Sequence, residues 1–105
     1  MNETTLYPNW QDQVVYGSDG PQPHILMANE KVKALMAGLA PGAKIPEHAE
    51  AQSLYHFLEG TGWMIVDGKR LPVSAGATIV MPAGAVRGLE AETQLALGVF
   101  QMSYT

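Results

Sequence analysis

Short apolar runs separated by turn residues fill most of the 105-residue chain. Most runs are about four to eight residues long, and apolar residues often alternate with other residues within them. They end in Gly, Pro, Asn or Asp, which is typical of strands joined by tight turns. Asp67 and Gly68 between two such runs are a strong hairpin signal. About nine strands are predicted, and their regular spacing indicates an all-β barrel or sandwich. The segments that carry them are 12–22, 24–31, 32–42, 53–62, 63–69, 70–84 with two strands, and 85–103 with two strands.

Two segments leave an alternative open. Residues 29–40 are rich in Ala, Leu, Met and Lys, which are good helix formers, but the hairpins on either side favour a strand. Residues 1–12 are polar with Tyr7 and Trp10 among them, and they are predicted to form an N-terminal arm before a barrel domain at 13–105. The arm is either a loose tail or is docked by its two aromatic side chains. An arm that crosses to a second subunit would also cover an exposed sheet edge.

Composition restricts the class of protein. Hydrophobic residues make up 47% and charged residues 15% of the chain, which is enough for one packed domain. The net charge is -4 and no basic stripe is present, so nucleic acid is not expected as a partner. No apolar run is long enough to span a membrane and no signal peptide is recognised, so a cytoplasmic location is expected. The chain has no cysteine, which excludes disulfides, thiolate metal sites and cysteine nucleophiles.

Two sequence segments carry a resemblance to a known family. The first is PGAKIPEHAEAQSLYHFLEGTGWMIVDG at 41–68, and the second is AGATIVMPAG followed by AVRG at 75–88. Together they cover roughly half of the chain, and they resemble the two motifs of the cupin superfamily. The resemblance implies a single cupin domain, which is an RmlC-like jelly-roll barrel (a double-stranded β-helix), and it implies a homodimer.

In many cupins the first motif supplies two His and one Glu, the second motif supplies a third His, and the four side chains bind a divalent metal. At the place of the third His this chain has Arg87. A guanidinium stays protonated and offers no lone pair, so it cannot ligate a metal. The resemblance therefore implies a degenerate metal site.

The register of the first motif is ambiguous. Counting forward from Gly42 places His48 at the first His position and Glu50 at the second. Counting back from Gly60 places His48 at the second position and Pro46 at the first. Neither count leaves a carboxylate at the Glu position. His48 and Glu50 are thus the two candidate metal ligands that remain. A transition-metal site needs about three or four protein ligands.

The other two histidines are not expected to join His48. Strand side chains alternate between faces, so if Ser53, Tyr55 and Phe57 point into the barrel, His56 points out. His24 opens a different strand and has no evident partner. Each is interpreted as a hydrogen-bonded or surface residue.

Three roles stay open for Arg87. It pairs with a carboxylate from Glu47, Glu50 or Glu90, or it awaits an anionic ligand, or it turns to water at the barrel mouth. The remaining pocket is expected to be apolar and aromatic. Three further side chains, those of Trp63, Met64 and Met81, are expected to pack the barrel itself.

These observations predict a small-molecule-binding cupin barrel, with no catalytic residue assigned. An anionic or carbonyl-bearing compound would be held by Arg87 and His48, with Glu50, Tyr55 and Phe57 as further ligand contacts. No cofactor is predicted outright. The alternative is a metal-dependent enzyme (a dioxygenase, isomerase or decarboxylase) that acts on a small organic acid, with a divalent transition metal on His48 and Glu50. A third reading is a structural or regulatory dimer without a ligand.

Overall fold

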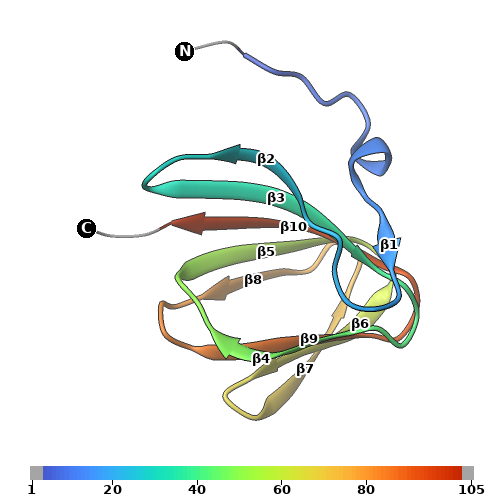
Figure 1. Cartoon of the computed structure of the whole chain (residues 1–105). Helices are drawn as coiled ribbons and strands as arrows, with labels where there is room; N and C mark the ends of the chain where they lie inside the picture. The colour runs from blue at the N-terminus through green and yellow to red at the C-terminus, as the bar shows by residue number, and fades with distance from the viewer. Residues whose placement is uncertain (1–3, 103–105) are drawn as a thin grey trace.

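Two sheets, antiparallel except for the parallel pair β1 and β3, pack face to face in the computed structural model, which describes residues 4–102 (Figure 1). The larger sheet has six strands in the order β1-β3-β10-β5-β8, with β2 also paired to β3. The smaller sheet has the order β4-β9-β6-β7. Apart from the short 3-10 helix η1 (Trp10–Gln13), the elements are β1 (Tyr16–Gly17), β2 (His24–Ala28), β3 (Val32–Leu39), β4 (Lys44–Ala49), β5 (Gln52–Glu59), β6 (Thr61–Val66), β7 (Lys69–Ser74), β8 (Thr78–Met81), β9 (Val86–Ala91) and β10 (Leu95–Met102).

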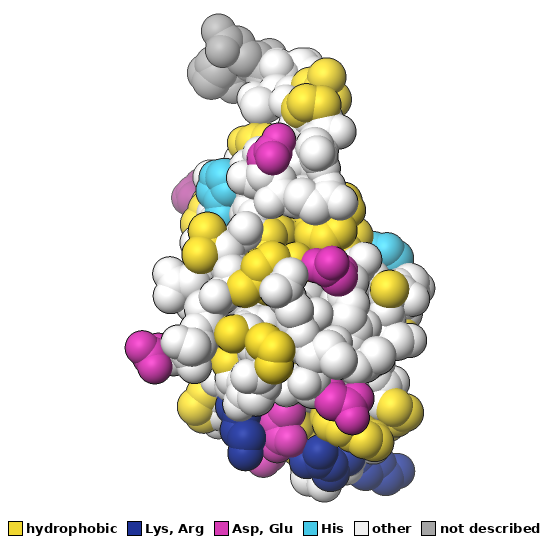
Figure 2. All heavy atoms as spheres, turned by 90° about the vertical axis from the view of Figure 1, so that its right-hand side faces the viewer, with side chains coloured by type: hydrophobic (Ala, Val, Ile, Leu, Met, Phe, Trp, Pro, Cys, Tyr) yellow, Lys and Arg dark blue, Asp and Glu magenta, His cyan; other side chains and the backbone are white. Residues whose placement is uncertain are grey.

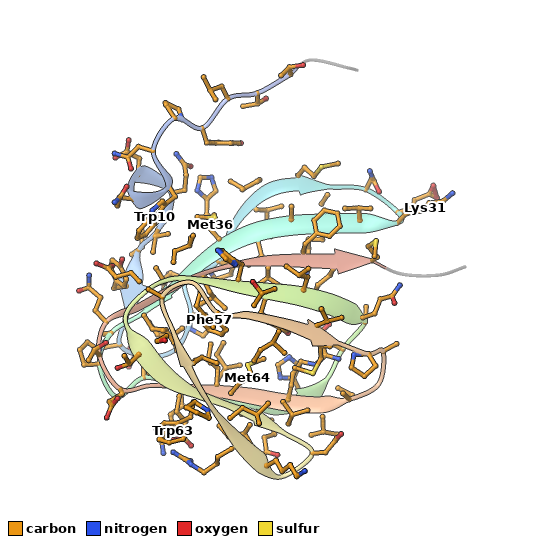
Figure 3. The ribbon with its side chains drawn as sticks, turned by 180° about the vertical axis from the view of Figure 1, so that it is seen from behind. Trp10, Lys31, Met36, Phe57, Trp63 and Met64 are labelled. Carbon is orange, nitrogen blue, oxygen red and sulfur yellow. The ribbon has the colours of Figure 1, made fainter. Side chains whose placement is uncertain are left out.

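The core lies between the two sheets, on the inward faces of their strands. On the larger sheet the register places Tyr55 beside Val99, and Phe57 beside Leu97, so that inward side chains form rows across the strands. Phe57 is fully buried, and Met64 from the smaller sheet is 2% exposed in the same apolar cluster. Figure 3 shows both side chains inside the barrel. Alternation along each strand thus separates an apolar interior from an outer face, as a closed jelly roll requires.

The strand predictions are confirmed with one omission. The segment that contains good helix formers is the eight-residue strand β3, because its alternate side chains Leu35, Ala37 and Leu39 face the core. The strand that was not predicted is β4. It contains Pro46 and two charged residues, and its pairing with β9 shifts register between Ile45 and His48. A strand with proline and a bulge lacks the alternation that reveals strands in a sequence.

Turn chemistry at the hairpins follows the sequence. Asp67 and Gly68 both have positive φ, at 49° and 86°, and join β6 to β7 as predicted. The Asp67 side chain also accepts a hydrogen bond from the backbone N–H of Val86 at 3.0 Å. This contact fixes the hairpin against the start of β9, the strand that carries Arg87.

The two aromatic side chains of the arm make different contacts. Trp10 packs against the cluster of Val14, Met36 and Ala96. Tyr7 makes an edge-to-face contact with His24, with ring centroids 6.4 Å apart. The chain before η1 nevertheless stands clear of the barrel (Figures 1 and 2). In residues 4–102 no helix has the length and apolar character needed to cross a bilayer.

Candidate functional site

The guanidinium of Arg87 is buried inside the barrel. Arg87 lies on the inward face of β9, between Val66 of β6 and His48 of β4, and it is only 1% exposed. Its side chain crosses from the smaller sheet to the larger one, where it reaches the start of β5. Arg87 therefore links the two sheets at one end of the barrel.

All five N–H groups of the guanidinium donate hydrogen bonds to neutral acceptors. Four acceptors are backbone carbonyls and two are hydroxyls. The acceptors are Ala85 O at 3.1 Å from Nε, Ala51 O at 2.9 Å, Ser53 Oγ at 3.0 Å and Tyr55 OH at 3.4 Å from Nη1, and Glu50 O at 3.1 Å and Pro82 O at 3.0 Å from Nη2. They belong to the β4–β5 connection, to β5 and to the turn between β8 and β9.

This arrangement contradicts two of the three roles open to Arg87. Neither of the two ion pairs in residues 4–102 involves it, and Glu50 meets the guanidinium through its backbone carbonyl and not through its carboxylate. The expectation that Arg87 turns to water at the barrel mouth is wrong as well, because its side chain is fully buried. A ligand would have to displace existing acceptors to bind the guanidinium directly. The geometry supports a brace that holds the β4–β5 connection in place.

His48 and Glu50 form an ion pair at the same end of the barrel. The register of β4 and β9 places His48 opposite Arg87, and His48 Nε2 lies 3.3 Å from Glu50 Oε2. Both side chains are about two-fifths exposed, at 43% and 41%. His48 Nδ1 lies 2.9 Å from the carbonyl of Pro46. Because a carbonyl only accepts, Nδ1 carries a hydrogen, and Nε2 is the atom that is available for Glu50 or for a ligand.

The inward and outward positions on β5 are as predicted. Ser53, Tyr55 and Phe57 are buried on the inner face, and Tyr55 and Ser53 hold Arg87. His56 points outward and lies 2.7 Å from the hydroxyl of Thr78. Phe57 is fully buried in the apolar core cluster.

Met64 and Met81 pack the barrel interior as predicted, at 2% and 1% exposure. The expectation for Trp63 is wrong. Trp63 lies on the outer side of the smaller sheet (Figure 3), where the Arg70 guanidinium is 4.8 Å from its ring centroid. The parity of β6 explains this, since Met64 is the inward residue and its neighbour must face out.

A polar row closes the inner face of the larger sheet at the Arg87 end. The register aligns Lys33, Gln101 and Ser53 on neighbouring strands β3, β10 and β5. A hollow of about 200 Å³ adjoins this row, and its lining includes Asn29, Lys31, Lys33, Ala51 and Gln101. Ala51 belongs to both parts of the site, because its carbonyl accepts from Arg87. Sequence reasoning missed these lysines, although Lys33 continues the inward phase of Leu35 and Ala37.

The residues present do not fit the metal that the fold family implies. In residues 4–102 no three His, Asp or Glu side chains converge in a way that could hold a metal ion. His48 and Glu50 are two candidate ligands, and the neighbouring position on β9 carries a guanidinium that cannot donate a lone pair.

Comparisons with known proteins agree with the barrel. The Cupin domain family matches residues 35–100, which is 66 of the 105 residues, and the chain belongs to this family. A conserved protein of unknown function from Streptococcus pyogenes superposes with a TM-score of 0.86 at 21% identity, over 99% of this chain and 92% of that chain. An RmlC-like cupin from Shewanella frigidimarina gives a TM-score of 0.79 at 20% identity, over 99% and 96% of the two chains.

A larger enzyme contains a similar barrel. A mutant of salicylate 1,2-dioxygenase from Pseudoaminobacter salicylatoxidans superposes with a TM-score of 0.65 at 25% identity, over 69% of this chain and 21% of that chain. No curated protein matches this chain. The predicted fold class, a single RmlC-like cupin of the jelly-roll type, is confirmed.

Proposed function

We propose that this cupin binds a small organic anion at the end of the barrel that Arg87 braces. One observation carries the proposal: three cationic side chains gather around Ala51. Arg87 binds its carbonyl, and Lys31 and Lys33 line the hollow that Ala51 borders. Carboxylates and phosphates are the ligands that such a concentration of positive charge favours.

Arg87 contributes charge and shape to this site without touching the ligand. Its acceptors are neutral, so no carboxylate in direct contact cancels its charge. A buried charge is screened by water less than an exposed one. The guanidinium therefore adds to the field of Lys33 at the open end, while its bonds to Glu50 O and Ala51 O hold the connection that borders the hollow.

The pair of His48 and Glu50 gives the site a second polar group, in the part of the chain that directly precedes Ala51. His48 Nε2 lies 3.3 Å from the Glu50 carboxylate, which is the anionic group beside it within the chain. A ligand carboxylate that approaches this side would replace Glu50 as the acceptor. Tyr55 lies beneath the site, and its hydroxyl stays on Arg87.

Isothermal titration against a panel of small carboxylates and phosphates tests the proposal. We expect Lys33→Met to weaken the binding of the best compound about tenfold, because one direct charge contact is lost. His48→Gln is expected to weaken it as well. Lys44→Met is the matched control, since Lys44 is exposed on the outer side of β4, and its affinity should equal that of the wild type. No binding from any compound on the panel, or equal losses for Lys33→Met and Lys44→Met, would overturn the proposal.

The alternative function is a metal-dependent enzyme for a small organic acid. The similarity of the barrel to a salicylate 1,2-dioxygenase supports this alternative, and His48 and Glu50 would be its first metal ligands. Elemental analysis of protein purified without chelators separates the two functions. Stoichiometric iron, manganese, nickel or zinc that is lost in His48→Gln would establish the metal-dependent alternative. The cytoplasmic location stays a prediction from the sequence.

A further inference from the structure

The hollow at the Arg87 end of the barrel is lined by two lysines and by no acidic side chain. Lys31 lies at the tip of the β2–β3 hairpin (Figure 3), and Lys33 is the second residue of β3. Among residues 4–102, no Asp or Glu lines the hollow, and Glu30 of the same hairpin tip is not one of its lining residues. The wall of the hollow therefore presents positive charge without a carboxylate of its own.

The Asn29 amide adds a neutral donor to this lining. Its Oδ1 accepts from the backbone N–H of Lys31 and from that of Val32, both at 2.9 Å. An amide oxygen has two lone pairs, and both are used here, so the NH₂ group is the part of the amide that is left for a ligand. A ligand with several acceptor oxygens and no donors matches such a lining.

The contacts within the hairpin tip favour carboxylates over phosphates. Phosphate sites often use successive backbone N–H groups of a turn or of a helix N-terminus. Here the N–H groups of Asn29, Lys31 and Val32 already donate within the turn. The main donors that remain are the two ammonium groups, and each of them acts as a separate point charge.

Two apolar side chains and a small volume complete the hollow. Val32 and Met102 are paired across β3 and β10, and both line it. Methylene groups that cover this pair are removed from water, whereas inorganic phosphate gains nothing from the contact. The volume is about 200 Å³, which is the space of roughly seven water molecules at about 30 Å³ each. A ligand with a few methylene groups between its polar ends fits this space.

We propose that the preferred ligand is a short aliphatic dicarboxylate, an inference that rests on the anion site proposed above. Along an extended chain the Cα atoms of Lys31 and Lys33 are about 6–7 Å apart. A single carboxylate neutralises one of the two ammonium charges, whereas an anion with a carboxylate at each end neutralises both. The methylene groups between the two carboxylates then lie against Val32 and Met102.

Isothermal titration of succinate and glutarate against butanoate, pentanoate and inorganic phosphate tests the preference. Each dicarboxylate is expected to bind about tenfold more tightly than the monocarboxylate with the same number of carbon atoms, because it accepts from a second charged group. Lys31→Met and Lys33→Met should each remove this advantage, since one ammonium group remains. A monocarboxylate can use either lysine, so each variant should weaken its binding only about twofold.

Asn29→Asp tests the neutral donor. Aspartate can accept the same two N–H bonds, so the turn should persist, which circular dichroism and thermal melting check. The change replaces the NH₂ donor by negative charge, and it should weaken the binding of glutarate at least about tenfold. Lys44→Met is the matched control, because Lys44 is exposed on β4 and does not line the hollow. It should leave every affinity unchanged.

The possible results separate the dicarboxylate preference from the anion site itself. Equal affinities for glutarate and pentanoate would overturn the preference and leave the anion site standing. Tighter binding of phosphate than of either dicarboxylate would do the same, and so would an equal loss of the dicarboxylate advantage in Lys44→Met. No binding by any compound on the panel would overturn both the preference and the anion site.

Discussion

Replacing Arg87 by methionine tests how much its buried guanidinium stabilises the fold. Methionine keeps most of the side-chain length and removes all five donors. Ala85 O, Ser53 Oγ and Tyr55 OH then stay in the interior without their donor. The carbonyls of the β4–β5 connection and of the β8–β9 turn are only partly buried, so water can reach them.

The expected loss follows from these contacts. Three fully buried acceptors at about 1–3 kcal/mol each give roughly 3–9 kcal/mol. Removing a buried charge that has no carboxylate partner offsets part of this loss, because the guanidinium no longer has to be desolvated on folding. We expect a net decrease in the free energy of unfolding of about 3 kcal/mol. For a domain of this size that corresponds to a fall in Tm of about 12–24 °C.

Urea denaturation of Arg87→Met, with the slope m held common to both proteins, measures this loss. Arg70→Met is the matched control, because Arg70 is half exposed and makes one ion pair with Glu90 and one contact with the ring of Trp63. It should lose less than about 1 kcal/mol. An Arg87→Met protein within about 0.5 kcal/mol of the wild type would refute the bracing role.

Two further variants test the turn geometry and one titrating side chain. Gly60 has φ of 89°, and a Cβ there would lie 1.8 Å from the carbonyl oxygen of Gln94, so Gly60→Ala should lose more than about 2 kcal/mol in urea denaturation. Gly84→Ala, with φ of 83° and free space around the new methyl group, should lose only about 1 kcal/mol, and equal losses would contradict the clash. Burial, and then the hydrogen bond to the Glu59 carboxylate, raise the pKa of Tyr16, so its neutral form is favoured in the folded state. The stability it contributes is complete below the ordinary tyrosine pKa of about 10 and is lost as pH rises through the raised value, so Tyr16→Phe should lose less stability than the wild type between neutral and alkaline pH. Identical alkaline stability profiles for the two proteins would count against this.

The barrel itself was predictable, because its strands carry strong local signals. The alternation along β5 separates Tyr55 and Phe57 from His56 correctly, and the Asp67–Gly68 turn marks its hairpin. The strand β4 was not predictable from alternation. Pro46 and the register shift break its pattern, and it is held in place by pairing with β9, which is distant in sequence.

The candidate site was predicted only in part. Placing Arg87 in the barrel required the motif alone, but the identity of its acceptors depends on the path of the β4–β5 connection. Backbone carbonyls leave no trace in a sequence, so the guanidinium seemed to need a carboxylate. Lys33 and Gln101 were missed for a related reason, since only the register between β3 and β10 brings them to the row that contains Ser53.

A crystal structure of the chain grown with a small carboxylate and with divalent transition metals present tests the central claim most directly. The account predicts the carboxylate beside Lys33 and Ala51, with the Arg87 guanidinium still bound to the carbonyls of Glu50 and Ala51. A metal ion coordinated by His48, with Arg87 turned out of the barrel, would contradict the account and would establish the metal-dependent alternative.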